Sequence, residues 1–207
     1  LDLLESEPHI SVEFLPTHGD ELPSSVGREF DALVVLAPQV TAETLLDSDR
    51  LTLVARFGVG YDKVDVDACT KNDVMLTITP DGVRRPVAAS ALALLMALSH
   101  KLLAKDRLTR EGNWHNKIDY IGVGLTNRTL GLVGLGNIGR EIARIAAPLD
   151  MRHVAYDPFV SADDAAALGV DMLGLDDLLR QADFVCICCA LTPDSRRLLG
   201  AAELGLM

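Results

Sequence analysis

Short apolar runs alternate with segments of mixed polarity along the whole chain. The apolar runs predict β-strands at residues 11–15, 32–36, 53–56, 75–78, 129–133, 153–156 and 184–189. Helix-like spacing between them covers residues 41–46, 65–70 and 175–181. Because strands that alternate with helices are typical of βαβ units, the pattern predicts an α/β protein with parallel sheets.

One amphipathic stretch is longer than the others and predicts a helix over residues 86–110. Its apolar side chains recur at helical spacing, at Val87, Ala91, Leu94, Leu95, Leu98 and Leu102. Pro86 suits the first helical position, and Gly112 suits the end. Because a helix of this length can leave one domain and enter another, we place a boundary near Leu98. The expected domains are residues 1–98 and 99–207.

Composition narrows the classes of partner. The chain has 207 residues, of which 49% are hydrophobic, and a formal net charge of −11. The negative charge disfavours nucleic acid and anionic membranes as partners. The longest nearly apolar run, 88–98, is too short to span a bilayer, and no secretory signal is visible. The chain begins with Leu1 rather than Met and ends within a helix-like run, so we expect truncation at both ends.

The four cysteines indicate whether the protein's surroundings are oxidising or reducing. Cys186, Cys188 and Cys189 share the run 184–189, and Cys69 stands alone. Their spacing matches no usual zinc pattern. We interpret them as small hydrophobic side chains rather than metal ligands or a redox pair. Free thiols suit a reducing cytoplasm.

The strongest chemical signal is a glycine motif, GLGNIG, at residues 134–139. It follows the strand-like run 129–133 and opens the helix-like run 140–149. Gly134 permits a tight turn, Gly136 lets the backbone approach a diphosphate, and Gly139 lets the helix pack close to the strand. Asp157, after the next apolar run, is placed to accept hydrogen bonds from ribose hydroxyls. Together these features indicate dinucleotide binding; the alternative is a glycine-rich turn in an ordinary α/β protein.

Several segments taken in order resemble the D-isomer-specific 2-hydroxyacid dehydrogenase family, which includes phosphoglycerate dehydrogenase and hydroxypyruvate/glyoxylate reductase. Besides the long helix, the matching segments are ARFGVGYD at 55–62, TPDG at 79–82, REGNW at 110–114, LGLVGLGNIG at 130–139, YDP at 156–158 and LTPD at 191–194. The resemblance implies two doubly wound parallel-sheet domains. A Rossmann cofactor domain would be inserted into a smaller, flavodoxin-like substrate domain.

The resemblance also implies an activity: NAD-dependent hydride transfer between a D-2-hydroxy acid and a 2-keto acid. Position by position, it implies cofactor contacts at Thr79, Gly134, Gly136, Asn137, Ile138, Gly139, Asp157, Cys189 and Thr192. It implies that the substrate carboxylate is held by Arg56, Val59 and Gly60. The charge of Asp157 would repel a 2′-phosphate, which favours NAD over NADP.

The family's catalytic arginine, histidine and carboxylate are expected downstream of Met207, so we assign no catalytic residue and no metal site in this chain. His153 is interpreted as structural. Departures from the family pattern at Ile78, Ala89, Cys188 and Ala190 leave the substrate open. Arg84 and Arg85 are interpreted as part of a solvated loop rather than as residues that attract an anionic substrate.

Two other functions are compatible with parts of the pattern. The family resemblance extends to NAD-sensing, non-catalytic corepressors, and a nucleotide-binding enzyme such as a methyltransferase is a third reading that the Arg56 loop disfavours. The resemblance further implies a homodimer acting on a small 2-keto or 2-hydroxy acid, and the free thiols indicate a cytoplasmic location. Its interface would lie in residues 102–126, through Trp114, Ile118, Tyr120 and Ile121.

Overall fold

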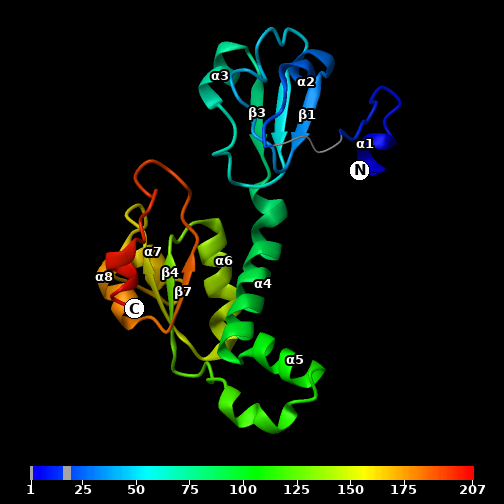
Figure 1. Cartoon of the computed structure of the whole chain (residues 1–207). Helices are drawn as coiled ribbons and strands as arrows, with labels where there is room; N and C mark the ends of the chain where they lie inside the picture. Colours follow the sequence, from blue (N-terminus) through cyan, green and yellow to red (C-terminus); the bar gives the residue numbers. More distant parts are fainter. Residues whose placement is uncertain (1, 16–19) are drawn as a thin grey trace. The chain divides into compact units, whose positions relative to one another are not determined.

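The computed structural model describes residues 2–15 and 20–207, and these form two compact units. The first unit comprises Leu1–Phe57 and Tyr61–Ile78, and the second comprises Gly58–Gly60 and Thr79–Met207. Figure 1 traces the order of the elements along the chain. The division by contacts falls at Thr79, earlier than the boundary expected near Leu98, because the helix that follows Thr79 packs within the second unit.

The first unit is built on a three-stranded parallel sheet. Its order is β1 (Ala32–Val35), β2 (Leu53–Arg56) and β3 (Met75–Ile78). The helices are α1 (Asp2–Glu5), α2 (Ser24–Glu29) and α3 (Val66–Lys71), and the side chain of Asp65 caps α3 by accepting from the Ala68 N–H at 2.8 Å. Leu33, Val35 and Val54 point into the core of this unit. The α/β prediction with parallel pairing is therefore confirmed here.

Two local expectations for this unit are wrong. Residues 11–15 form no strand, because they pair with no described strand, and the side chain of Phe14 is 72% exposed. Residues 41–46 form hydrogen-bonded turns instead of a helix, with the Leu45 N–H donating to the Thr41 carbonyl at 3.3 Å. Apolar content alone does not make a strand, since a strand needs a neighbour for its N–H and C=O groups.

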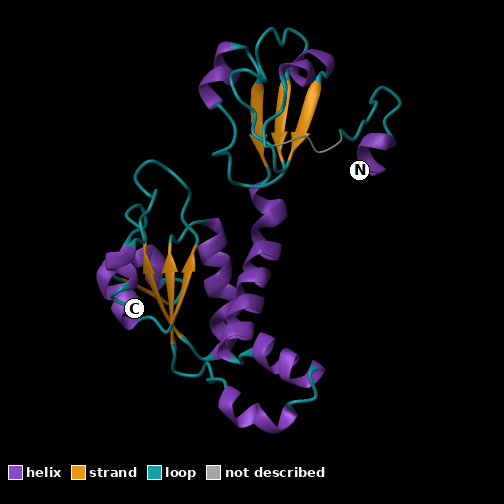
Figure 2. Cartoon of the chain, viewed as in Figure 1, coloured by secondary structure: helices purple, strands orange, loops and turns teal. Residues whose placement is uncertain are grey.

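The second unit contains a four-stranded parallel sheet in the order β6-β5-β4-β7. Figure 2 shows strands in orange and helices in purple. The strands are β4 (Thr129–Val133), β5 (Arg152–Tyr156), β6 (Val170–Met172) and β7 (Phe184–Ile187). All five residues of β4 are buried, as expected for the central strand of a parallel sheet. The chain runs outward through β5 and β6 and then returns to the other side of β4 as β7. A topological switch point therefore lies between the carboxyl ends of β4 and β7.

The helices that follow β4 in this unit are α6 (Asn137–Ala146), α7 (Ala162–Ala166), α8 (Leu175–Gln181) and α9 (Ala201–Leu204), with a 3-10 turn η2 (Ala147–Leu149). The start of β7 is tied to the start of β4 by Asp183. Its carboxylate accepts from the Thr129 N–H at 2.8 Å and from Arg128 Nη1 at 2.6 Å. The Thr129 hydrogen bond lowers the pKa of Asp183, and the arginine acts in the same direction.

The predicted helix over 86–110 is two helices, α4 (Pro80–Ser99) and α5 (Leu102–Arg110), followed by the 3-10 segment η1 (Trp114–Tyr120). Pro86 lies inside α4 rather than at its start. The break is at Lys101, which has a left-handed backbone with φ 51°. Its cause is tertiary, because the Val123 N–H donates to the Ser99 carbonyl at 2.7 Å and occupies that acceptor.

Among the described residues, α4 is long and apolar enough to cross a membrane by length and composition. Helices of soluble cores pass the same test, so this is weak evidence. Ala88 and Leu95 of α4 are buried in the core that also contains Ile142 of α6, and α4 packs more extensively against α6 than against any other element. That packing makes α4 the partner of the helix that follows the glycine motif.

Candidate functional site

The glycine motif forms a tight turn between β4 and α6, at the switch point of the sheet. Gly134 has φ 100°, and a Cβ there would lie 2.6 Å from the Cys189 backbone nitrogen. A Cβ at Gly139 would overlap the Gly134 carbonyl oxygen. Only glycine fits either place. By contrast, a Cβ at Gly136 would meet nothing within 4 Å, so the middle of the turn faces open space.

The N-terminus of α6 borders the same open space. Gly136 is its N-cap residue and provides no side-chain cap, and both Gly136 and Asn137 are exposed. The first N–H groups of a helix have no partner within the helix, and the helix dipole favours negative charge there. The turn therefore presents backbone donors to an anion, which is the physical requirement for holding a diphosphate.

Asp157 lies directly after β5 and faces the glycine turn. Its Oδ2 accepts from the Leu135 N–H at 2.8 Å, and its Oδ1 accepts from the Phe159 N–H at 2.9 Å. The Gly134 N–H donates to the Tyr156 carbonyl at 2.8 Å and brings the two loops together. A carboxylate oxygen accepts more than one hydrogen bond, so the half-buried Asp157 retains acceptor capacity for a sugar hydroxyl.

The segment after β7 forms the opposite side of the turn. The Cys188 N–H donates to the Val133 carbonyl at 2.7 Å, and the backbone of Cys189 lies against Gly134. Thr192 begins a local turn in which its N–H donates to Ser195 Oγ at 2.8 Å. The structure therefore brings Cys189 to the glycine turn and involves Thr192 in a turn of its own.

The cysteines are free thiols, as expected, but they are less buried than a core strand implied. β7 ends at Ile187, whose side chain is 63% exposed, and Cys186, Cys188 and Cys189 are half-buried. Burial raises the pKa of Cys188 to about 12 and also raises the pKa of Cys186. Protonated thiols are poor nucleophiles and poor metal ligands. Within residues 2–15 and 20–207 no cluster of three or more potential metal ligands occurs.

The residues expected to contact the substrate lie on the segment that begins with Arg56. Arg56 ends β2, and its Nη1 donates to the carbonyls of Val35 at 3.2 Å and Phe57 at 2.5 Å. In the second unit, the Gly58 N–H donates to Thr79 Oγ1 at 2.8 Å, and the Thr79 N–H donates to the Gly58 carbonyl at 2.9 Å. This pair of hydrogen bonds fixes the loop of Val59 and Gly60 beside the start of α4.

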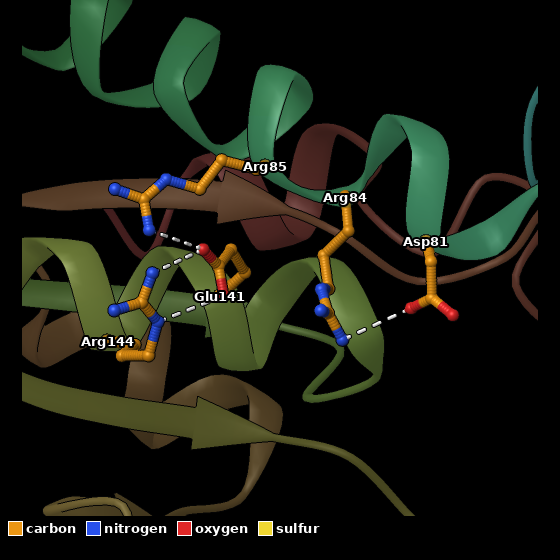
Figure 3. Close-up of polar contacts among 5 residues, drawn as sticks. All are labelled: Asp81, Arg84, Arg85, Glu141 and Arg144. Carbon is orange, nitrogen blue, oxygen red and sulfur yellow. Dashed lines mark hydrogen bonds and ion pairs between the residues drawn. The ribbon is translucent and has the colours of Figure 1, made fainter.

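An ion-pair cluster between α4 and α6 was not anticipated from the sequence (Figure 3). The side chain of Glu141 is 10% exposed and accepts from Arg85 Nη1 at 3.2 Å and from Arg144 Nη2 at 2.7 Å. Arg84 pairs with Asp81 within α4 at 3.4 Å. The expectation that Arg84 and Arg85 lie in a solvated loop is therefore wrong, because α4 begins before them. The i,i+3 spacing of Glu141 and Arg144 could have indicated that pair, whereas the Arg85 contact is tertiary.

His153 is the one histidine on a strand of this sheet. Its side chain is buried, and its Nε2 has no hydrogen-bond partner in the described part of the chain. Burial lowers the pKa of His153. It lies on β5 opposite Leu130 of β4, inside the sheet rather than at its carboxyl edge.

Comparison with known proteins identifies the family. The model of the D-isomer specific 2-hydroxyacid dehydrogenase, NAD binding domain, matches residues 92–207, which is more than half of the chain. The chain belongs to this family. The resemblance inferred from the sequence motifs is confirmed, and the glycine turn, Asp157 and β4 to β7 all lie inside the family's NAD-binding domain.

Relatives within the 2-hydroxyacid dehydrogenase family are considerably longer than this chain. It is 42% identical over 181 residues to D-3-phosphoglycerate dehydrogenase of Mycobacterium tuberculosis, covering 87% of the chain and 34% of that protein. It is 33% identical over 218 residues to glyoxylate reductase of Thermococcus gammatolerans, covering 100% of the chain and 64% of that protein. The chain thus spans about a third of the length of the curated phosphoglycerate dehydrogenases it matches.

A solved structure supports the fold. D-lactate dehydrogenase from Aquifex aeolicus, complexed with NAD and lactic acid, superimposes with a TM-score of 0.79 at 24% identity. The match covers 91% of this chain and 57% of that one. The α/β fold with a Rossmann domain is therefore shown, and the NAD-binding domain identifies NAD as the cofactor of the family.

Proposed function

We propose that the protein is an NAD-dependent oxidoreductase that interconverts a D-2-hydroxy acid and a 2-keto acid. The observation that carries the proposal is the placement of Asp157 on the Leu135 N–H of an open glycine turn, at the switch point of a family NAD-binding domain. Bound NAD supplies the acceptor or donor of the hydride. The chain's own residues bind and orient the two reactants.

The glycine turn and α6 fit the cofactor's charge and shape. Backbone N–H groups at Asn137 and Ile138 would hold the diphosphate, while Asp157 would accept from the ribose hydroxyls. Thr79, Cys189 and Thr192 remain proposed contacts. Carboxylate charge at Asp157 disfavours a 2′-phosphate, so the cofactor is NAD rather than NADP.

We assign binding of the substrate carboxylate to the Arg56 guanidinium and to the N–H groups of Val59 and Gly60. An arginine and two backbone donors suit a planar anion, since charge-assisted hydrogen bonds to a carboxylate are roughly twice as strong as neutral ones. We assign no acid or base among residues 1–207. The relatives' names, phosphoglycerate dehydrogenase and glyoxylate reductase, suggest small acids of this class as substrates.

The test uses the complete natural polypeptide that carries this chain. NADH consumption is followed with glyoxylate and hydroxypyruvate, and NAD reduction is followed with 3-phosphoglycerate. Turnover with at least one acid is expected, together with a preference for NADH over NADPH. Tight NADH binding without turnover across the panel would favour the non-catalytic, NAD-sensing alternative, which nothing in the comparisons supports. Absence of NADH binding would overturn both.

A further inference from the structure

Leu135 is held through both of the peptide groups that flank it. The Leu135 N–H donates to Asp157 Oδ2 at 2.8 Å, and the Leu135 carbonyl accepts from Arg140 Nε at 3.0 Å. The Leu135 side chain is completely buried. The glycine turn therefore has little freedom at this residue, although the residue itself was not singled out by the glycine motif.

Arg140 acts on the turn through two groups. Its backbone N–H donates to the Gly136 carbonyl at 2.9 Å, and its Nε donates to the Leu135 carbonyl. One residue at the end of the first helical turn of α6 thus donates to two successive carbonyls of the glycine turn. A carbonyl at this position has no acceptor role within the helix, and leaving it without a donor would let the peptide rotate.

The direction of one donor follows from this contact. Because the peptide is planar and trans, the Leu135 carbonyl and the Gly136 N–H point in opposite directions. By holding the carbonyl, Arg140 aims the Gly136 N–H away from its own guanidinium. That N–H has no acceptor within the described part of the chain, and no atom lies within 4 Å of a Cβ at Gly136. Gly136 therefore carries a backbone donor without an acceptor on an exposed residue of the turn.

The arginines of α6 have different roles. Arg144 forms an ion pair with Glu141 at 2.7 Å. Arg140 is half-buried and forms no ion pair with any residue of 2–15 and 20–207. Its side chain is thus held by the glycine turn rather than by a carboxylate.

We propose that Arg140 is a positioning residue for the cofactor: it fixes the Leu135 carbonyl so that the Gly136 N–H and the first N–H groups of α6 face the diphosphate. The inference rests on the proposed NAD site and deepens it. Arg140 acts through the turn, while Asp157 holds the other end of the same residue. The diphosphate then binds a turn that is already in the required conformation, which lowers the ordering cost of binding.

The experiment compares three variants of the complete natural polypeptide by NADH fluorescence titration. R140M removes the donor and the charge, and R140K retains a charge and a donor. R144M is the matched control, because it removes one positive charge from the same helix without touching the turn. We expect R140M to weaken NADH binding by about tenfold. R140K should recover most of that affinity, and R144M should stay within about twofold of the wild type.

Thermal unfolding without cofactor separates positioning from stability. R140M and R144M should melt at similar temperatures, so that only the NADH dissociation constant distinguishes them. Equal NADH affinity of R140M and the wild type would overturn the inference, as would equal weakening by R140M and R144M, which would indicate a general charge effect. A wild type that does not bind NADH would instead refute the proposed function.

Discussion

At the scale of single residues, Asp157 has two roles: it holds the glycine turn in place, and it is the proposed acceptor for the sugar. Its carboxylate already accepts two backbone N–H groups, from Leu135 and Phe159, before any sugar is present. The sequence motif correctly indicated an acid near the glycine turn. It did not indicate the hydrogen bond from Leu135, because that contact depends on how the loops after β4 and β5 meet, whereas the contact with Phe159 is local to the loop after β5.

The first prediction concerns this carboxylate. Asp157→Ala should raise the NADH dissociation constant by about tenfold or more, because the sugar loses an acceptor and the turn loses a brace. The same change should narrow the preference for NADH over NADPH, since the negative charge that repels a 2′-phosphate is gone. Parallel titrations with NADH and NADPH measure both effects. Asp171→Ala, at an exposed position of the edge strand β6, is the control and should leave both dissociation constants unchanged.

A second residue-scale prediction follows from His153. Burial lowers the pKa of His153 in the folded state. Below about pH 6.5 the His153 imidazole is therefore protonated in the unfolded chain before it is protonated in the folded chain. Stability should therefore fall as the pH drops from about 6.5 toward the folded-state pKa. Urea unfolding at about pH 7.5 and about pH 5.5 measures the loss, which His153→Leu should reduce.

The exposed His100 provides the comparison, because His100→Gln should keep the pH dependence of the wild type. At the higher pH, His153→Leu should be no less stable than the wild type, since it removes a buried nitrogen that has no hydrogen-bond partner. An unchanged loss of stability in His153→Leu would show that other groups control the acid sensitivity.

At the scale of elements, what could be predicted depended on whether the cause was local. Local sequence patterns predicted β4 and β5, which are short apolar runs, and α8, which has helical spacing. The prediction of a strand at 11–15 was wrong because no described strand pairs with these residues. The single helix expected over 86–110 failed because Val123, distant in sequence, takes the Ser99 carbonyl. Side-chain contacts between helices, such as Arg85 with Glu141, leave no periodic signal at all.

The third prediction concerns the ion pairs of Glu141, one of which connects α4 to α6. Glu141→Ala should lower the free energy of unfolding by about 1–3 kcal/mol, because it removes a buried acceptor shared by two arginines and leaves their charges unpaired. Asp106→Ala is the matched control. It breaks an exposed pair with Arg110 inside α5 and should cost less than about 1 kcal/mol. Urea unfolding measures the free energy of unfolding of both variants, and equal decreases in the two would contradict the prediction.

At the scale of the whole molecule, the uncovered apolar side chains indicate where a second chain would pack. Ile118 and Ile121 are 69% and 65% exposed on and beside η1, and Trp114 is 48% exposed. Large apolar side chains gathered on one segment are uncommon on the surface of a monomer. The segment belongs to the second unit, so an interface there would join the cofactor domains of two copies.

The last prediction is that this segment forms a homodimer and that Ile118→Asp disrupts it. A charge placed in the apolar centre of an interface must be desolvated without a partner, which outweighs the contacts that remain. Phe14→Asp is the control, because Phe14 is 72% exposed but lies in the first unit. Light scattering during size-exclusion chromatography should show dimers for the wild type and Phe14→Asp, and monomers for Ile118→Asp. A wild-type monomer, or a dimer that survives Ile118→Asp, would mean that the exposed residues of η1 serve another contact.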